Sequence, residues 1–423
     1  MPSTGQGSLW ENSQLLRALM PLQWFYACCG VALPPILIQP PRKNSPKIFA
    51  LLIWFLFSLY VTLLNILVSW MVCKSNEILE QVVQLYILDE VTKILTAVQT
   101  YDVVAVQLAM LWCIFCKRKT LREIHKIVAE LERDICLFEK SLEDKSEEFQ
   151  KSCYRFRRRL FSRCVVFLIL HSFLLGYAKF PLVWYSLSNF GKLLILITFH
   201  LMHAKCSEYR IMMQLLDEII TALLFSLMNL KYEIARHQIL GSCGAIKESK
   251  LHEKLRSHQF LVARYWYLIK LVESYFALPM LVLFLYNGIN VVHSINWIYV
   301  RTFIHMHLDT KHPNRASYII LLFINIMWTC WLSQICIDKV GTGYQQMANI
   351  LHSIKLPVND LSLRHRLREY SLQLKHQKIQ FSCWGFFDIN MKYFGLMSLA
   401  ILTYVFILLQ FKMQEQTEKV KRL

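Results

Sequence analysis

The chain has 423 residues, of which 55% are hydrophobic and 18% are charged, and its mean hydropathy is +0.35. Soluble domains average about 45–50% apolar and about 25% charged residues, so this composition excludes an ordinary soluble protein, a disordered chain, a collagen-like chain and a secreted disulfide scaffold. The net charge of +18 fits either a nucleic-acid-binding protein or a membrane protein with basic cytosolic loops, and the positions of the charges favour the membrane protein.

The N-terminal segment contains the first uncharged stretch, but this stretch is not typical of a membrane span. Residues 21–41 carry no charge, and five prolines interrupt them. Because proline breaks the interior of a helix, we expect this stretch to lie at the membrane surface or to re-enter the membrane. Residues 1–47 are therefore predicted to form a cytosolic or interfacial segment.

Seven later stretches are apolar enough to enter a bilayer. The hydrocarbon core is about 30 Å thick and requires about 20 apolar residues in a helix. The predicted spans are Ile48–Cys73, Ile94–Cys116, Leu160–Tyr185, a fourth that begins at Leu193–Lys205, Leu271–Val292, Ala316–Ile337 and Tyr393–Phe411. Asp102 and Glu273 are charged residues inside these spans, and such residues are costly in lipid and often functional.

The distribution of basic residues predicts the orientation of the spans. With seven spans, 34 of the 47 lysines and arginines fall on the side of the N-terminus and 11 on the opposite side. Because cytosolic loops are enriched in lysine and arginine, we predict an all-α polytopic membrane protein with a cytosolic N-terminus and an extracellular C-terminus. Residues 48–337 then hold spans one to six, residues 338–411 a cytosolic helix and the seventh span, and residues 412–423 an extracellular tail.

The long cytosolic loops, 117–159 and 206–265, are predicted to be helical. One of them carries an apolar seam with spacings of three and four residues, which is typical of an amphipathic helix that packs on its own chain or, less often, of a coiled coil between subunits. The seam consists of Leu121, Ile124, Val128, Leu131, Ile135, Phe138 and Leu142. Residues 206–240 and 245–270 are expected to extend spans four and five into the cytosol, and 360–379 is expected to form a further helix.

No pattern in the chain indicates enzymatic chemistry. The sequence contains no nucleotide-binding glycine loop, no nucleophile elbow and no HExxH zinc motif. His305, His307 and His312 cluster in one loop, but only Asp309 accompanies them, so we expect neither a metal nor a cofactor. Nucleic acid is not expected as a partner.

The seventh span carries two polar residues on one stripe. Leu396, Ala400, Thr403, Ile407 and Gln410 follow the helical period, and Thr403 and Gln410 are polar. A ring of such helices around a water-filled axis would close by dewetting at its apolar residues and would pass ions along its polar ones. The alternative is a helix enclosed in the core of one subunit, and the spacing alone does not decide between the two.

The same span contains Thr403-Tyr404-Val405-Phe406-Ile407-Leu408-Leu409-Gln410-Phe411, which matches the TYhhhhhQF signature of insect gustatory receptors. Upstream, Gly385-Phe386-Phe387-Asp388-Ile389-Asn390 resembles the block that precedes this helix in the family, and Pro21-Leu22-Gln23-Trp24 with Cys29-Gly30 resembles its opening. The span count and orientation extend the resemblance over the whole chain.

This resemblance implies a tetrameric, ligand-gated, non-selective cation channel, homomeric or heteromeric, in the plasma membrane of chemosensory neurons. Its seventh helices would line the pore, with Thr403 on the pore stripe and Ile407, Gln410 and Phe411 at the gate. The cytosolic helices would hold the tetramer together. A small-molecule tastant would bind in the outer half of each subunit, for which the candidate residues are Gln99, Tyr177, Trp184, Tyr185, Tyr286, Asn287 and Trp328.

Bitter or otherwise aversive compounds are the first expectation for the ligand, because they are the ligands of the largest group in that family. A G-protein-coupled receptor is an alternative, but it would place the basic loop 117–159 outside the cell. A secondary transporter is a second alternative, but that class favours internal repeats and broken helices, and this chain has only 12 glycines.

Overall fold

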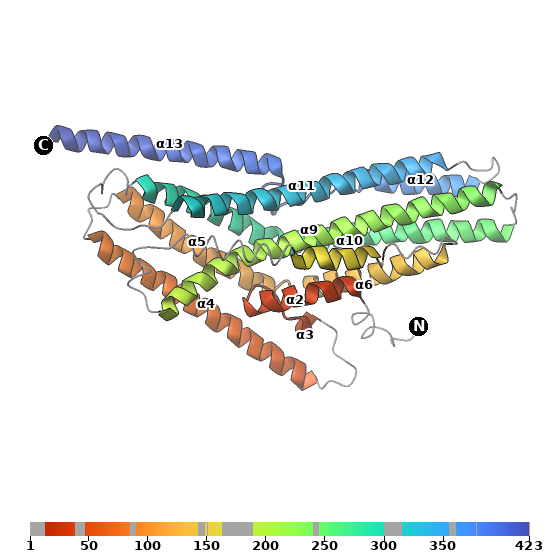
Figure 1. Ribbon diagram of the computed structural model, residues 1–423, viewed down its shortest axis with the longest axis horizontal. Coiled ribbons are helices and arrows are strands. Elements are labelled where there is room, and N and C mark those ends of the chain that lie inside the picture. Colours follow the sequence, from red (N-terminus) through yellow and green to blue (C-terminus); the bar gives the residue numbers. More distant parts are fainter. Residues whose placement is uncertain are drawn as a thin grey trace.

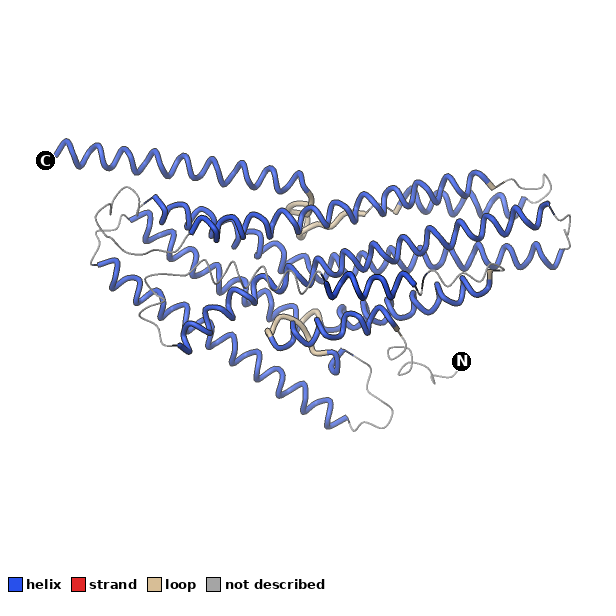
Figure 2. Tube along the Cα trace, viewed as in Figure 1, coloured by secondary structure: helices blue, strands red, loops and turns tan. Residues whose placement is uncertain are grey.

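The computed structural model describes residues 13–38, 47–84, 90–142, 149, 151–162, 189–239, 245–299, 315–354, 361–377 and 379–422. Within these ranges the chain is helical almost throughout, and its only extended pairing is one isolated bridge (Figure 2). The helices are α2 (Gln14–Cys28), α3 (Pro35–Ile38), α4 (Lys47–Gln84), α5 (Glu90–Phe115), α6 (Arg118–Ser141), α9 (Asn189–Ile239), α10 (Ala245–Tyr299), α11 (Arg315–Ser353), α12 (Leu361–His376) and α13 (Met391–Arg422). Residues 151–162 form a further helical segment.

Three long helices, α9, α10 and α11, run through most of the molecule (Figure 1). α4, α5 and α13 lie around one end of these helices, and α6 and α12 lie around the other. α9 has 51 residues and α10 has 55, so at about 1.5 Å per residue each is more than twice as long as the hydrocarbon core is thick. The predicted continuation of spans four and five as helix is therefore confirmed, and the cytosolic location of these extensions stays a prediction.

The all-α membrane fold expected from the sequence is confirmed. Spans one, two, five, six and seven fall within α4, α5, α10, α11 and α13, and the fourth begins α9. The third predicted span, Leu160–Tyr185, lies almost entirely outside the described residues, as does the loop with His305, His307 and His312. The orientation of the termini and the division of the chain into segments stay predictions.

Five helical stretches in the described part of the chain are long and apolar enough to cross a membrane: Ile48–Trp70, Val91–Phe115, Ala204–Arg236, Leu251–Asn296 and Met391–Gln414. The third of these falls largely within the loop that we predicted to be cytosolic. It is 61% buried inside the protein, against 11% for Ile48–Trp70. Its Asp217 forms an ion pair of 2.6 Å with Lys339, and Glu218 pairs with Arg159. Because the stretch is enclosed by other helices, its apolar composition is explained by the protein core without lipid.

The N-terminal segment forms two short helices and not a span. α2 contains Pro21 and ends at Cys28, and Gly30 follows with a φ of 70°. The buried carboxylate of Glu132 in α6 holds the start of α2, because it accepts hydrogen bonds from the Ser13 hydroxyl and from the backbone N–H groups of Gln14 (2.7 Å) and Leu15 (3.2 Å). A carboxylate at a helix N-terminus satisfies donors that otherwise lack partners. This segment is thereby docked on α6 and α9.

The predicted seam of α6 is confirmed as a packing face within the subunit. All seven of its apolar residues are buried: Leu121, Ile124, Val128, Leu131, Ile135, Phe138 and Leu142. α6 packs on α10, α9, α2 and α3. The seam thus packs against helices of its own chain, and the alternative prediction of a coiled coil between subunits is wrong.

His258 of α10 connects three helices of this end of the molecule. Its Nδ1 atom lies 2.7 Å from the Tyr370 hydroxyl of α12. Its Nε2 atom lies 2.9 Å from both the Leu223 carbonyl and the Ser226 hydroxyl of α9. The ring is fully buried, and burial lowers its pKa from 6.5 to about 4. It is therefore neutral in the folded protein at neutral pH.

We expect His258 to make the folded protein sensitive to acid. Its folded pKa lies below the unfolded value, so its stabilising effect is complete above pH 6.5 and is lost as the pH falls towards 4. At pH 5 the loss amounts to about 2 kcal/mol. His258→Leu should lower the free energy of unfolding by about 2–4 kcal/mol at pH 7.5, because buried polar partners lose their hydrogen bonds.

Thermal unfolding of the purified full-length protein at pH 7.5 and pH 5 measures both effects. The variant should also lose less stability than the wild type between these two pH values. His365→Leu is the matched control, since His365 is exposed and its one ion pair, with Glu369, is long at 3.7 Å. An unchanged pH dependence in His258→Leu would contradict the assignment.

Candidate functional site

A tight hairpin precedes α13 and determines where that helix begins. The backbone N–H of Cys383 donates to the Phe387 carbonyl at 2.9 Å, and that of Ile389 donates to the Phe381 carbonyl at 2.8 Å. Trp384 and Gly385 at its tip have φ values of 54° and 78°, a conformation that favours glycine and that two-residue hairpin turns require. The Gly-Phe-Phe block found in the sequence is therefore a turn.

Asn390 and Glu273 anchor the two sides of this hairpin. The Asn390 side-chain oxygen accepts from the Tyr393 backbone N–H at 2.9 Å, which is the geometry of a helix N-cap. Glu273 of α10 accepts from the Ser382 backbone N–H at 3.2 Å and pairs with Lys270 at 2.8 Å. The charge of Glu273 inside the fifth predicted span thus serves to attach the hairpin.

Aromatic rings fix the base of α13 against α10. Phe387 stacks on Tyr393 with ring centroids 3.8 Å apart, and Phe284 of α10 meets both rings edge-on at 5.9 and 5.3 Å. Such arrangements add to the free energy of apolar burial. The hairpin and this cluster therefore set the direction in which α13 leaves the bundle.

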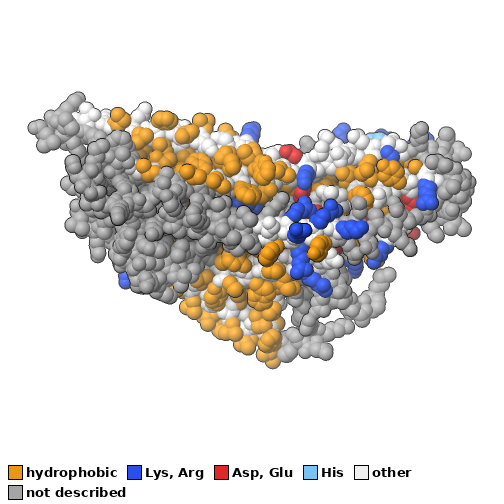
Figure 3. Space-filling view, viewed as in Figure 1, with side chains coloured by type: hydrophobic (Ala, Val, Ile, Leu, Met, Phe, Trp, Pro, Cys, Tyr) orange, Lys and Arg blue, Asp and Glu red, His pale blue; other side chains and the backbone are white. Residues whose placement is uncertain are grey.

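Beyond its base, α13 contacts its own subunit along one narrow face. Ile401 and Lys412 are its only fully buried residues among those that are described, and Met397 and Val405 pack partly against α10 and α11. The window of α13 that could span a membrane is only 6% buried. Figure 1 shows the helix lying at the edge of the molecule, and Figure 3 shows apolar side chains along it. A helix enclosed in the subunit core is therefore excluded.

The predicted pore stripe lies on the side of α13 away from this packed face. Its five members are exposed: Leu396, Ala400, Thr403, Ile407 and Gln410. The gate candidate Phe411 is 65% exposed and Tyr404 of the signature is also 65% exposed. At 100° per residue, Thr403 and Gln410 lie about 160° and 180° from Ile401. The two polar residues of the stripe thus point away from the subunit's own helices.

The C-terminal half of α13 is attached to α5 by a buried cation. The Lys412 ammonium donates to the Thr92 hydroxyl at 3.2 Å, and the side-chain amide of Asn296 in α10 donates to the same oxygen at 3.0 Å. Lys412 is 4% exposed and Thr92 is 1% exposed. This junction holds α13 to the half of the bundle that the sequence predicts to be the outer one, where the ligand candidates lie.

Four of the seven predicted ligand residues can be located in this outer half. Gln99 of α5 donates to the Asn290 side-chain oxygen at 2.6 Å. Tyr286 and Asn287 of α10 are buried, Asn287 donates to the Leu283 carbonyl of its own helix, and its Oδ1 atom has no hydrogen-bond partner among the described residues. Trp328 of α11 is half-buried. Tyr177, Trp184 and Tyr185 lie outside the described residues.

Asn290, the polar partner of Gln99, was not predicted from the sequence, and neither were His293 and Asn296, which lie beside it on α10. Asn287, Asn290, His293 and Asn296 are spaced by three residues on α10, and all four are buried. His293 lies 3.4 Å from the Thr96 hydroxyl of α5. Three-residue spacing of polar side chains within an apolar span was a signal that could have found them, because residues three apart are neighbours on a helix surface, and the four therefore form a continuous polar row that winds around the helix.

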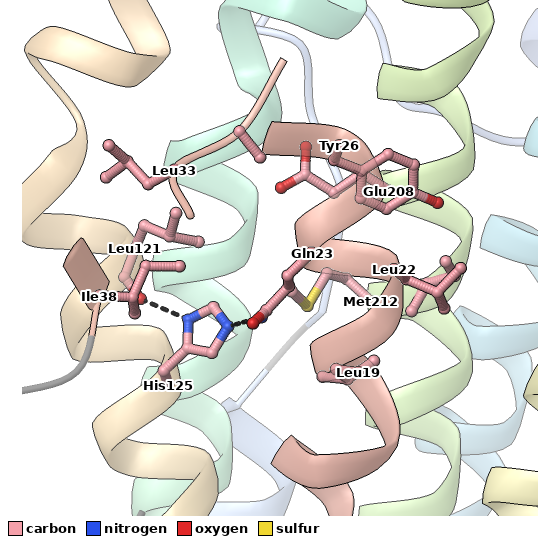
Figure 4. Close-up of a pocket in the computed structure, with 12 residues that line it drawn as sticks. Leu19, Leu22, Gln23, Tyr26, Leu33, Ile38, Leu121, His125, Glu208 and Met212 are labelled. Atoms are coloured by element: carbon pink, nitrogen blue, oxygen red, sulfur yellow. Dashed lines mark hydrogen bonds between the residues drawn. The ribbon is translucent and has the colours of Figure 1, made fainter. Parts of the chain in front are cut away.

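A small pocket lies near the middle of the molecule, between α2, α6 and α9 (Figures 1 and 4). Gln23 of α2 reaches the His125 ring of α6, whose Nδ1 lies 2.8 Å from the Leu121 carbonyl. Glu208 of α9 lines the opposite side. The pocket holds about one water-sized volume, so it is too small for an organic ligand. Asp102 of α5, the charged residue inside the second predicted span, has one buried carboxylate oxygen without a hydrogen-bond partner in the described part of the chain.

The described residues contain no group of three or more histidine, cysteine, aspartate or glutamate side chains that could hold a metal ion. Two candidate functional sites remain in the described part of the chain: the exposed stripe of α13 and the polar contact between α5 and α10.

Comparison with known proteins places the chain in a family. The family model described as "7tm Chemosensory receptor" matches residues 19–415. The Drosophila melanogaster protein assigned as gustatory receptor 98b is 30% identical over 395 residues, which cover 89% of this chain and 91% of that protein. Gustatory receptor 98c of the same species is 38% identical over 176 residues, covering 41% of each chain.

The fold is similar to that of the insect olfactory receptor OR5 from Machilis hrabei. The two chains superpose with a TM-score of 0.64 over 94% of this chain and 98% of that one. A second structure of that receptor, in complex with eugenol, superposes with a TM-score of 0.55 over 92% and 98%. The identities are 12% and 14%, so this likeness concerns the fold alone. The matching family is one of chemosensory receptors and not of enzymes. The chain therefore belongs to the 7tm chemosensory receptor family and is a relative of the Drosophila gustatory receptors.

Proposed function

We propose that the protein is a subunit of a ligand-gated, non-selective cation channel that detects small organic tastants, with bitter or aversive compounds as the first ligand class. It acts as a homo- or heterotetramer in the plasma membrane of chemosensory neurons, with its N-terminus in the cytosol and its C-terminus outside. The observation that carries this proposal is the placement of Thr403 and Gln410 on an exposed helix face that points away from the subunit.

Lipid is a poor environment for the Gln410 side chain. A side-chain amide in hydrocarbon lacks hydrogen-bond partners, which costs several kcal/mol. The Thr403 hydroxyl has a hydrogen-bond partner within its own helix, because it donates to the Leu399 carbonyl at 3.0 Å. The exposed Gln410 amide forms no hydrogen bond with a described residue. Four such helices around an axis would give these side chains water and one another, and the apolar residues between them would close the pore by dewetting.

Ligand binding in the outer half has a route to this helix. Gln99, Tyr286, Asn287 and Trp328 stay candidates for ligand contact, with Tyr177, Trp184 and Tyr185. A ligand that changed the spacing of α5 and α10 would also move Thr92 and Asn296, which hold Lys412 of α13. The relatives' assignment as gustatory receptors and the eugenol complex of a receptor with this fold support a small organic ligand.

Gln410→Ala tests the pore assignment. If Gln410 faces the axis, the variant should change the relative permeability to sodium, potassium and calcium, or the sensitivity to pore blockers, in cells that express the receptor with its co-subunits. Leu402→Ala is the matched control, because Leu402 is also exposed on α13 but lies about 80° from Gln410 around the helix. Unchanged permeation in a conducting Gln410→Ala channel would remove this residue from the pore.

A further inference from the structure

The helical segment 151–162 carries most of the charge of a basic cluster that the ion channel proposal does not use. Lys151, Arg155, Arg157, Arg158 and Arg159 lie within twelve residues, directly before the third predicted span. Figure 1 shows this segment as a short yellow helix near the middle of the molecule. Clusters of four to eight basic residues on the cytosolic side of a membrane helix are typical of anionic-lipid binding.

One face of this helix attaches it to the bundle. Cys153, Phe156 and Leu160 are each 2–3% exposed. The Ser152 hydroxyl donates to Glu218 of α9 at 2.9 Å, and Arg159 forms an ion pair with the same carboxylate. These contacts fix the orientation of the segment, so its opposite face is held outward.

The outward face alternates basic and aromatic side chains. Lys151, Tyr154, Arg158 and Phe161 are spaced by three, four and three residues, which places them on one stripe of the helix. All four are exposed, Tyr154 by 68% and Phe161 by 71%. Exposed aromatic rings of this size are unfavourable in water but are enriched at the membrane interface, where an apolar body and a polar surrounding coexist.

Among the described residues, three positive charges of this face have no neutralising partner. The side chains of Lys151, Arg157 and Arg158 form no hydrogen bond or ion pair with any residue that the structure describes. Arg155 makes only a long contact of 3.4 Å to the Lys151 backbone carbonyl. Within the described part of the chain these charges are available to an external anion, and arginine matches the geometry of phosphate oxygens.

The position of this face coincides with the edge of the lipid-exposed surface. In Figure 3 lysine and arginine side chains gather beside the point where the apolar surface over α4 and α13 ends. α4 begins at Lys47 and α13 at Met391, and Figure 1 shows that these two helices begin at similar positions along the long axis of the molecule. A basic and aromatic face at this boundary lies at the level of the lipid headgroups, between the hydrocarbon core and the bulk cytosol.

We propose that this face, formed by Lys151, Tyr154, Arg158 and Phe161 with Arg155 and Arg157 beside it, binds the phosphate-bearing headgroups of anionic lipids in the cytosolic leaflet. This proposal rests on the proposed function, because the orientation given there places residues 151–162 in the cytosol. The arginines bind the phosphate and the two aromatic rings enter the interface. The lipid thereby attaches α6, α9 and the third span to the membrane surface.

Crosslinking of the full-length receptor tests this proposal. The protein is reconstituted into phosphatidylcholine vesicles that contain a small share of headgroup-photoactivatable phosphatidylserine or, in a parallel sample, of photoactivatable phosphatidylcholine. Mass spectrometry then locates and quantifies the crosslinked peptides. We expect phosphatidylserine crosslinks to concentrate on residues 151–162 and to exceed those of phosphatidylcholine there.

Arg157→Gln/Arg158→Gln should lower the phosphatidylserine yield at this segment about tenfold, because each basic residue near the surface strengthens binding to an anionic membrane. Both side chains are exposed and unpaired among the described residues, so the fold should be unaffected, which an unchanged melting temperature would verify. Arg364→Gln/Arg368→Gln in α12 is the matched control: it removes the same charge from exposed positions at the far end of the bundle and should leave the yield unchanged.

Equal crosslinking of the two lipids at 151–162, or an unchanged yield in Arg157→Gln/Arg158→Gln, would overturn the proposal. Loss of the crosslinks on addition of inorganic phosphate would also overturn it, since the site would then belong to a soluble anion. Crosslinking does not depend on ion conduction. If the crosslinks form as expected but Gln410→Ala leaves permeation unchanged, lipid binding is supported and only the pore assignment is rejected.

An epitope after Leu423, probed on intact and on permeabilised cells, tests the orientation separately. With seven spans, staining of intact cells places residues 151–162 in the cytosol and supports the proposal. Staining only after permeabilisation, with surface expression established independently, would overturn the assignment to the cytosolic leaflet.

Discussion

Glu208→Leu is expected to destabilise the receptor by about 3–5 kcal/mol and to prevent most of it from reaching the cell surface, because the substitution leaves a buried charge without its partner. Lys205 is fully buried, and Glu208 is 5% exposed. Their charged groups lie 2.7 Å apart, and the Lys205 ammonium also donates to the Tyr275 hydroxyl at 3.1 Å. The same ammonium lies 4.4 Å from the centre of the Tyr275 ring. Without Glu208 these neutral groups would have to compensate the charge alone.

The double variant Lys205→Met/Glu208→Leu should recover much of the lost stability. Replacement of a buried ion pair by apolar side chains of similar volume is often neutral or stabilising, whereas removal of one partner is not. Thermal unfolding in detergent and surface biotinylation measure the two effects. Glu369→Leu serves as the control, because Glu369 belongs to an exposed pair with His365 and should change stability by less than about 0.5 kcal/mol. Equal losses in the single and double variants would show that the pair itself is not the cause.

Ile407→Ser is expected to raise the resting conductance about tenfold or more. If Ile407 forms an apolar ring at the closed gate, four hydroxyls in its place would favour water in the constriction. A shift of only about 1.4 kcal/mol towards the hydrated state increases its population tenfold. Whole-cell current without ligand, normalised to surface protein, measures this leak.

Leu402→Ser is the control for this leak. It makes the same kind of apolar-to-hydroxyl change on an exposed face of the same helix, about 140° away from Ile407. This variant should conduct like the wild type at rest. A normal resting conductance in Ile407→Ser receptors at the surface would place the gate elsewhere.

The membrane helices were predictable because their signal is local. A run of about 20 apolar residues has few alternatives in any fold, and α4, α5, α10, α11 and α13 each contain such a run where it was expected. The limits of these helices were less predictable: α13 continues to Arg422, well past Phe411. Nothing in the apolar pattern marks the end of a helix that continues into water.

The contacts of charged residues in the spans, or just before them, were predicted less well, because the partners of these residues are distant in sequence. Asp388 and Lys392 are four residues apart, a spacing that would allow a pair on one helix face. The structure instead places Asp388 in the hairpin before α13, opposite Ser382, and no ion pair joins it to Lys392. Glu273 holds that hairpin through a residue 109 positions away in sequence, which no local pattern could show.

The sequence by itself determined the all-α membrane fold, the family and the period of the α13 stripe, because each of these depends on residues close together in the chain. Only the tertiary structure decided which side of α13 contacts its own subunit and that Thr403 and Gln410 lie on the opposite side. It also decided that Gln99 meets Asn290 and that Lys412 reaches Thr92. A helix has the same periodicity whichever side is packed, so the choice of side depends on the shape of its neighbours, and that shape exists only after folding.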